Sequence, residues 1–229
     1  MRLAHAGRAN HETSRPRANP WAILLLTLLQ ASAACSGSFG PPRLAHQEKQ
    51  EKEDQTMQPQ PKQTERAYLA GGCFWGVEYY LEQLPGVLSV TSGYMGGHTR
   101  NPTYADVCSG TTGHVETVEV RFDATVTDFK TIARRFFEIH DPTQLDRQGP
   151  DVGEQYRSVV FYTSEDQKKT AQQLIAQLKA RGYAVVTRVV PATHFWPAED
   201  YHQDYYRRTG KQPYCHIPVP RFAGPTNGP

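Results

Sequence analysis

A cysteine flanked by glycines has the neighbours that a nucleophile needs. Residues 71–76 are Gly-Gly-Cys-Phe-Trp-Gly, so Cys73 falls where a short apolar run ends and a helical pattern begins. Unpaired backbone N–H groups and the positive end of a helix dipole would both stabilise a thiolate there, and the thiolate is the reactive form. Phe74 and Trp75 would form an apolar wall beside the sulfur. Taken alone, the segment is equally consistent with a packed core cysteine.

Four other polar side chains lie in loops or where loops join strands. Tyr104 ends an Asn-Pro-Thr-Tyr turn, Glu116 opens a strand, and Asp151 and Tyr156 lie in a loop rich in glycine and proline. Loops of this kind can bring distant parts of a chain to one site. Taken singly, each of the four is more simply explained as a surface residue.

A histidine base would define an alternative function, because a cysteine nucleophile commonly needs one. His114 and His140 are the candidates, and a thiol hydrolase could use Cys73 with either of them. This alternative gives no reason for two tyrosines and a glutamate at the loop junctions.

The cysteines and the charge balance exclude several classes of protein. No two of the four cysteines form a Cys-x-x-Cys pair, which argues against a cysteine-rich zinc site. The net charge of +2 comes from residues 1–65, whereas the charges of residues 66–229 balance, so the body lacks the basic surface that nucleic acid requires. We expect a monomer that needs neither metal nor cofactor and binds no nucleic acid.

The first 35 residues have the pattern of an export signal. Arginines precede the apolar stretch 21–29, and small residues follow at 31–34, as in a cleaved secretory signal. Cys35 comes next and resembles the attachment cysteine of bacterial lipoproteins, although Ser32 stands where leucine is usual. We expect an exported protein, either periplasmic or anchored to the membrane by a lipid on Cys35. A buried core helix at 21–29 is the alternative.

The sequence predicts a linker over residues 36–65, a folded domain over residues 66–220 and a tail over residues 221–229. Gln, Glu, Lys and Pro dominate the linker, which cannot bury enough apolar surface to offset the entropy of ordering it. Within the domain, hydrophobic periodicity switches between strand and helix patterns. Strands are expected at 67–70, 87–94, 115–122, 157–162 and 184–190, and helices at 73–84, 129–137 and 164–181.

Interleaved strands and helices indicate an α/β (α+β) two-layer sandwich. We expect a mixed sheet with packed helices, a ferredoxin-like core and an irregular C-terminal tail from residue 191. Alternation along 115–122 predicts a strand buried on one face only. Ser164 and Gln167 predict a capping box at the start of the last helix.

Six motifs follow one another along the chain. They are Gly-Cys-Phe-Trp-Gly at 72–76, Gly-Tyr-x-Gly-Gly at 93–97, the stretch 101–108, Gly-His-x-Glu at 113–116, His-Asp-Pro-Thr-Gln at 140–144 and Gln-Tyr-Arg-Ser at 155–158. With these motifs in this order, the chain closely resembles the peptide methionine-S-sulfoxide reductases of the A type. The resemblance covers about residues 66–217, and Gly-Cys-Phe-Trp-Gly alone is fairly specific.

The resemblance implies a role for each candidate side chain. Cys73 corresponds to the nucleophile that attacks the sulfoxide sulfur, and Glu116 to the carboxyl that protonates the sulfoxide oxygen. Tyr104 and Tyr156 correspond to the phenols that hold this oxygen, and Asp151 to the acid that orients substrate and water. The implied product is a sulfenic acid on the cysteine together with free methionine.

The resemblance also implies an apolar cradle and a second thiol. Phe74 and Trp75 correspond to the cradle of the S-methyl group. Cys215 corresponds to the resolving cysteine, with Pro213 where the family has glycine, and a flexible tail would let this thiol travel. Cys108 also matches the family pattern, but there it is not the usual resolver, and we expect it to be a buried strand-end cysteine.

Recycling of the implied disulfide would require a thioredoxin-like dithiol. The implied substrates are oxidised proteins or free methionine sulfoxide. No cysteine follows Cys215, which argues against a relay of two disulfides. Glu154 stands where relatives often have threonine or proline, and the sequence assigns no effect to it.

Overall fold

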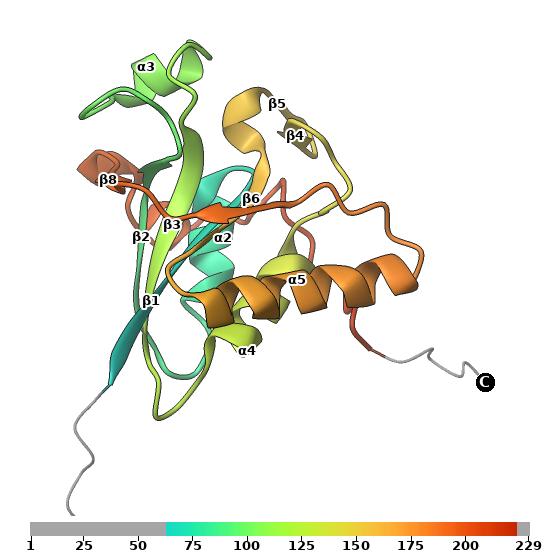
Figure 1. The fold of residues 1–229 in the computed structure, drawn as a ribbon. Coiled ribbons are helices and arrows are strands. Elements are labelled where there is room, and N and C mark those ends of the chain that lie inside the picture. Colours follow the sequence, from blue (N-terminus) through green and yellow to red (C-terminus); the bar gives the residue numbers. More distant parts are fainter. Residues whose placement is uncertain (1–62, 224–229) are drawn as a thin grey trace, which may run out of the picture. The chain divides into compact units, whose positions relative to one another are not determined.

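The computed structural model describes residues 63–223 of the 229-residue chain (Figure 1). The predicted export signal and most of the predicted linker lie outside these residues. In chain order the strands and α-helices are β1 (Thr64–Gly71), α2 (Phe74–Leu81), β2 (Val87–Met95), α3 (Tyr104–Cys108), β3 (Val115–Asp123), α4 (Phe129–Ile139), β4 (Arg147–Gln148), β5 (Asp151–Val152), β6 (Ser158–Tyr162), α5 (Glu165–Ala180), β7 (Arg188–Pro191), β8 (Trp196–Pro197) and α6 (Tyr205–Thr209).

Six strands form one mixed sheet in the order β7-β6-β1-β3-β2-β8. Neighbouring strands are antiparallel, except that β6 and β7 are parallel. The four central strands, with α2 crossing from β1 to β2 and α4 crossing from β3 to β6, follow the order β-α-β-β-α-β. This arrangement confirms the expected mixed sheet and ferredoxin-like core.

The main core lies between the sheet and helices α2, α4 and α5, which gather on one side of it (Figure 1). Leu81 of α2, Phe136 and Phe137 of α4 and Leu174 of α5 are almost fully buried there. Burial of each such side chain contributes on the order of 1.5–3 kcal/mol. The core therefore fixes α2, and with it Cys73, against the sheet.

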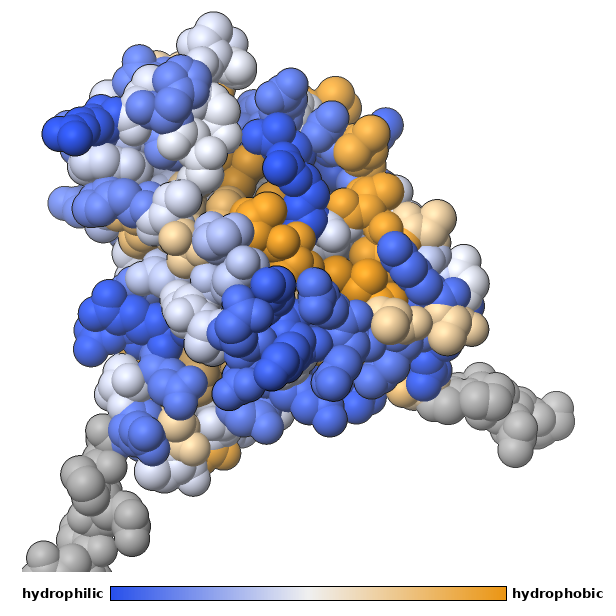
Figure 2. Space-filling model, in the orientation of Figure 1, coloured by the Kyte–Doolittle hydropathy of each residue, from blue (hydrophilic) through white to orange (hydrophobic). Residues whose placement is uncertain are grey.

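A smaller core covers the opposite face of the sheet. Ala70, Met95, Val115, Val159 and Phe161 form it. Residues on and after β7 pack over this cluster. Figure 2 shows the apolar side chains of the visible face gathered above helix α5, whose own outer surface is hydrophilic.

Strand β3 is buried more deeply than its alternating pattern predicts. Val118, Val120 and Phe122 face the main core as expected, but Thr117 on the other face is fully buried as well. Phe195 from the C-terminal segment covers this region, since it lies against Gly93, the β2 partner of Thr117. Burial on one face only therefore holds for the second half of the strand.

Each expected strand and helix has an observed counterpart, and the structure adds helix α3 and the short strands β4 and β5, which the sequence did not predict. The last predicted strand, 184–190, is shifted to β7 at Arg188–Pro191, and the segment after residue 191 contains β8 and α6. Strand β1 begins inside the predicted linker. Arg221 and Phe222 follow the expected domain end at 220 but are buried, and Arg221 donates to the Phe137 carbonyl. Within residues 63–223, no helix combines the length and apolar character needed to cross a membrane.

Helix α5 begins with half of the predicted capping box. The Ser164 hydroxyl accepts a hydrogen bond from the Gln167 amide at 3.2 Å. The Gln167 side chain accepts from the Thr163 amide rather than from Ser164, so the reciprocal bond is displaced by one residue.

Removal of this cap should destabilise the domain modestly. We expect Ser164→Ala to lower the free energy of unfolding by about 1 kcal/mol, because one helix N–H loses its acceptor. Urea unfolding measures the change, and Ser164→Thr, which keeps the hydroxyl, serves as the control. Equal stabilities for the alanine variant and the native chain would contradict this assignment of the cap.

Candidate active site

Cys73 is the N-cap residue of helix α2, directly after strand β1, and its side chain is only 6% exposed. Gly72 makes the sharp turn between the two elements, with φ at +91°. A side chain at Gly72 would also lie 2.4 Å from Cβ of Gln148, so both conformation and space require glycine. The junction predicted around Cys73 is therefore confirmed.

Glu116 is held at the start of the same helix. Its carboxylate oxygen Oε2 accepts a hydrogen bond from the Phe74 amide at 2.9 Å, and the side chain is 2% exposed. Glu116 shares the core-facing side of β3 with Val118 and Val120, which is why it points toward α2. Burial raises the pKa of Glu116 to about 8, although the Phe74 amide opposes the shift. The carboxyl is consequently protonated at neutral pH.

The Cys73 thiol is not the thiolate that a helix N-terminus alone would favour. A hydrogen bond with Cys215, burial and the nearby Glu116 carboxyl together raise the pKa of Cys73 well above its usual value. The Trp75 amide opposes this shift, as expected for a helix start, but is the weakest of these influences. The expectation of a low pKa for Cys73 is therefore wrong in the substrate-free protein.

Cys215 lies beside Cys73 rather than on a tail that must travel to it. The two sulfurs and a carboxylate oxygen of Asp151 lie within 4.8 Å of one another, and Cys215 is 7% exposed. The Tyr214 hydroxyl donates to both oxygens of Asp151, at 3.1 and 3.3 Å, which fastens the segment on one side. Both thiols are free, so the pair is a reduced one placed to form a disulfide.

The two thiols have opposite tendencies to ionise. Hydrogen bonding to Cys73 lowers the pKa of Cys215 to about 6, and His216 acts in the same direction against the effect of burial. When these two buried sulfurs share one proton, the negative charge therefore favours Cys215.

The predicted phenols come from two short helical turns. Tyr104 is the first residue of α3, and its amide donates to a carboxylate oxygen of Glu199 at 2.9 Å. Tyr156 ends a single 3₁₀ turn at Glu154–Tyr156 that precedes β6. Burial is the main cause that raises the pKa of each phenol. The hydrogen bond with Cys108 and then Glu116 add to the shift for Tyr104, and Glu116 adds to it for Tyr156. Both hydroxyls therefore remain protonated and able to donate.

An aromatic cluster stands on the side of α2 next to these phenols. Phe74 is fully buried and its ring lies 4.9 Å from that of His202. Trp75 stacks on Tyr205 with ring centroids 3.7 Å apart, and its indole N–H donates to Nδ1 of His202. Phe74 and Trp75, the residues predicted to form the cradle, thus belong to one aromatic cluster, and residues of the C-terminal segment hold their rings in place.

The two histidines of the alternative hydrolase are engaged elsewhere. Nδ1 of His114 accepts from the Gly97 amide and its Nε2 bonds to the Thr99 carbonyl. His140 bonds to the Phe136 carbonyl and the Ser158 hydroxyl, and burial lowers its pKa to about 3. With both ring nitrogens of each imidazole occupied, neither serves as a base for Cys73.

The prediction that Cys108 is a buried cysteine at the end of a strand is wrong. It is the last residue of helix α3, not of a strand, and it is exposed rather than buried. Its thiol interacts with the hydroxyl of Tyr104.

Cys35, the predicted lipid attachment residue, lies outside the described part of the chain. Glu154 forms an ion pair with Arg157 at 3.4 Å.

Sequence reasoning missed three residues that lie around the site: Glu199, His202 and His216. One carboxylate oxygen of Glu199 binds the Tyr104 amide and the other accepts from the Tyr94 hydroxyl at 2.9 Å. His202 packs against the Phe74 and Tyr104 rings. All three lie in the segment predicted to be an irregular tail, where no periodicity marked them.

Two groups of side chains among residues 63–223 could hold a metal ion. They are Cys73, Asp151 and Cys215, and Glu78, Glu82 and Asp204. The first group is the thiol pair already described. In the second, burial raises the pKa of Glu78 to about 8 and that of Glu82 to about 7, and Arg207 pairs with Asp204. Protons and a guanidinium thus balance the charge of the second group.

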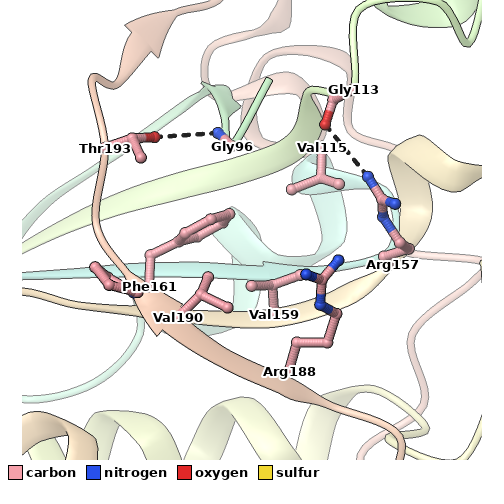
Figure 3. Close-up of a pocket in the computed structure, with 10 residues that line it drawn as sticks. Gly96, Gly113, Val115, Arg157, Val159, Phe161, Arg188, Val190 and Thr193 are labelled. Carbon is pink, nitrogen blue, oxygen red and sulfur yellow. Dashed lines mark hydrogen bonds between the residues drawn. The ribbon is translucent and has the colours of Figure 1, made fainter. Parts of the chain in front are cut away.

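A pocket of about 300 Å³ lies on the opposite face of the sheet (Figure 3). Val159, Phe161 and Val190 line its apolar part, and Arg157 donates to the Gly113 carbonyl at its edge. No predicted site residue lines this pocket, so it is separate from the thiol chemistry.

Comparison with known proteins identifies the family of the chain. The family model described as "Peptide methionine sulfoxide reductase" matches residues 65–225. The chain belongs to this family. It is 50% identical over 163 residues to the peptide methionine sulfoxide reductase MsrA of Chromobacterium violaceum, covering 69% of this chain and 93% of that protein. The MsrA of Saccharolobus solfataricus is 49% identical over 156 residues, covering 68% of this chain and 88% of that protein.

Solved structures agree with the family assignment. Reduced Mxr1 from Saccharomyces cerevisiae superposes with a TM-score of 0.65 at 30% identity, covering 70% of this chain and 95% of that one. Methionine sulfoxide reductase A of Corynebacterium diphtheriae superposes with a TM-score of 0.60 at 35% identity, covering 70% and 85%. The chain is accordingly an oxidoreductase of this family that reduces methionine sulfoxide, and its fold is the family's fold.

The neutral Glu116 carboxyl of this reductase generates a pH prediction. Because the raised pKa keeps the proton on Glu116 below about pH 8, a chemical step that uses this proton should be fast below pH 8 and slow above it. Glu116→Gln should slow single-turnover methionine release by about a hundredfold or more, since an amide cannot donate a proton of comparable acidity.

Rapid-quench measurement of methionine release from pH 6 to 10 tests both statements. Glu119→Gln is the matched control, because Glu119 lies on the same strand but bonds to Tyr68 on the other face. A Glu116→Gln variant as fast as the native reductase would show that the proton comes from elsewhere.

Proposed function

We propose that this reductase acts on the S epimer of methionine sulfoxide, in proteins or free, with Cys73 as nucleophile and Glu116 as acid. The observation that carries the proposal is the meeting of two free thiols and a buried neutral carboxyl at the start of one helix. A sulfoxide sulfur is a weak electrophile until its oxygen receives a proton. A neutral carboxyl can supply that proton at pH 7, whereas an ionised one cannot.

The first step transfers an oxygen atom from the sulfoxide sulfur to the Cys73 sulfur. The Cys73 sulfur attacks the sulfoxide sulfur while Glu116 protonates the oxygen, and the oxygen then passes to Cys73 as a sulfenic acid. The thioether of methionine leaves, and the thiol proton of Cys73 replaces the one that Glu116 donated. Protonation of Glu116 also removes a negative charge that opposes ionisation of the nucleophile.

The neighbouring side chains have complementary roles in this step. Tyr104 and Tyr156 donate hydrogen bonds to the substrate oxygen, because their raised pKa values keep them protonated. Phe74 and Trp75 receive the S-methyl group, and Asp151 orients substrate and water. A rigid apolar cradle beside a fixed donor set accounts for selection of one sulfur epimer.

The nucleophile is identified by a pair of cysteine variants. Cys73→Ser should abolish consumption of methionine S-sulfoxide with dithiothreitol as reductant, since a hydroxyl cannot take the sulfenic oxygen. Cys108→Ser should retain most of the activity, because this thiol lies at the exposed end of α3. Chromatography that resolves the two epimers should also show the R epimer untouched, and substantial turnover by Cys73→Ser would refute the mechanism.

The second step forms a disulfide between Cys73 and Cys215, which a thioredoxin-like dithiol then reduces. The separation of at most 4.8 Å between the sulfurs supports direct condensation with the sulfenic acid. A protein dithiol of low reduction potential suits a compartment without a reducing thiol pool.

Removal of the resolving thiol should separate the two halves of the cycle. Cys215→Ala should release one equivalent of methionine but fail to turn over with thioredoxin, while Cys108→Ala should turn over normally. Steady-state assays with thioredoxin and a stoichiometric assay without reductant measure the two properties. Normal thioredoxin-driven turnover by Cys215→Ala would mean that another route resolves the sulfenic acid.

We also propose that the reductase is exported as a monomer, periplasmic or bound to the membrane by a lipid on Cys35. The basic, apolar and small-residue order of the first 35 residues supports this proposal. Intact-mass analysis of the native protein should find a chain that begins near Ala34 or Cys35. A diacylglycerol mass on Cys35 would select the anchored form, and a cytosolic chain that retains residues 21–29 would refute export.

A further inference from the structure

His216 is a buried imidazole in contact with the second thiol, and the steps described above do not use it. Its side chain is 1% exposed. Nδ1 lies 3.1 Å from the Cys215 sulfur, and Nε2 lies 2.8 Å from the Gly71 carbonyl oxygen. Within residues 63–223, the Cys215 contact is the one hydrogen bond between an imidazole nitrogen and a thiol.

The Gly71 carbonyl determines which nitrogen of His216 carries the hydrogen. A carbonyl oxygen only accepts hydrogen bonds, so Nε2 must be the donor. In the neutral ring Nδ1 then has a free lone pair. Once Cys73 has become a sulfenic acid, its thiol no longer donates to Cys215, and this lone pair accepts the hydrogen of the Cys215 thiol. The assignment rests on the bonding partner, and it gives the ring the form that a base requires.

Helix α2 leaves space for the imidazole ring at Gly76, which holds the ring in this orientation. A Cβ atom at Gly76 would lie 2.2 Å from Nδ1 of His216, so the glycine leaves room for the imidazole. The Tyr80 hydroxyl, one turn further along α2, donates to the His216 carbonyl at 3.4 Å. The ring is therefore fixed by the same helix that carries Cys73 at its start.

We propose that His216 is the catalytic base of the resolving step, with the carbonyl of Gly71 holding it in the competent tautomer. This inference rests on the proposed function, because it requires a sulfenic acid on Cys73. It assigns separate proton-transfer groups to the two steps: a carboxyl for sulfoxide reduction and an imidazole for disulfide formation.

The step balances without any further reactant. Nδ1 of His216 takes the proton from the Cys215 thiol as the Cys215 sulfur attacks the Cys73 sulfur. The new S–S bond forms while the S–O bond of the sulfenic acid breaks, and the departing hydroxide takes the proton back as water. Cys215 is oxidised, the sulfenic sulfur of Cys73 is reduced to the disulfide level, and His216 ends neutral.

A single-turnover experiment without reductant tests the role. Reduced full-length protein is mixed with methionine S-sulfoxide, and rapid quench follows methionine release, sulfenic acid trapped by dimedone, and the Cys73–Cys215 disulfide by mass spectrometry. In His216→Ala we expect methionine release to be unchanged and disulfide formation to slow by about a hundredfold, so that sulfenic acid accumulates. Added imidazole should restore the disulfide rate, which a purely structural role would not allow.

Two further variants complete the test. Gly76→Ala keeps His216 in the chain, but the added methyl group fills the space that the imidazole ring occupies, so disulfide formation should slow. The double variant with His216→Ala should form the disulfide no more slowly than His216→Ala alone. Gly76→Ala also carries the test if His216→Ala does not fold. His114→Ala is the matched control, because it removes a buried imidazole that bonds to Gly97 and Thr99 instead of to a thiol. This variant should form the disulfide at the native rate.

The outcomes distinguish this inference from the proposed function. Disulfide formation at the native rate in both His216→Ala and Gly76→Ala would overturn the role of His216. If His216→Ala forms the disulfide slowly and added imidazole does not accelerate it, His216 has a structural role, and the proposed role as base would also be overturned. Failure of the proposed function would instead appear in the native protein, which would release no methionine.

Discussion

The hydrogen bond from the Phe74 amide to the Glu116 carboxyl is the contact on which the rest of the site depends. It joins the first turn of α2 to strand β3 across the main core, so Cys73 and Glu116 keep one geometry. Water is excluded there, and burial outweighs the amide in setting the protonation state. A buried carboxylate without a counter-ion is costly, so the site keeps a proton that the reaction can use.

Helix α2 organises both halves of the catalytic cycle. In the proposed mechanism, its first amide holds the acid Glu116 and its N-cap residue Cys73 is the nucleophile. The space at Gly76 receives the imidazole beside the second thiol. The C-terminal segment supplies the opposite wall through Cys215 and the aromatic cradle around Trp75. Because the two sulfurs are already neighbours in the reduced protein, resolution requires little rearrangement of the backbone.

Much of the fold and part of the site could be predicted from local patterns. Alternation predicted the half-buried strand β3, and Glu116 lies on its apolar face with Val118 and Val120. The sequence alone, however, explained this carboxyl more simply as a surface residue. The glycine-flanked junction at Cys73 was equally clear. The raised pKa of Cys73 was not, because it depends on Cys215 and Glu116, which are distant in sequence. The positions of Glu199 and His216 could not be predicted for the same reason, because long-range packing of a segment without periodicity determines them.

The central claim is that Glu116 is a neutral acid at physiological pH. Infrared difference spectroscopy on the substrate-free protein measures this directly, because a protonated carboxyl has a carbonyl stretch that a carboxylate lacks. The band that is absent from a Glu116→Gln sample should persist at pH 7 and disappear with a midpoint of about 8. A midpoint near the ordinary value for glutamate, about 4.3, would contradict the account, since no proton would then be held for the sulfoxide oxygen.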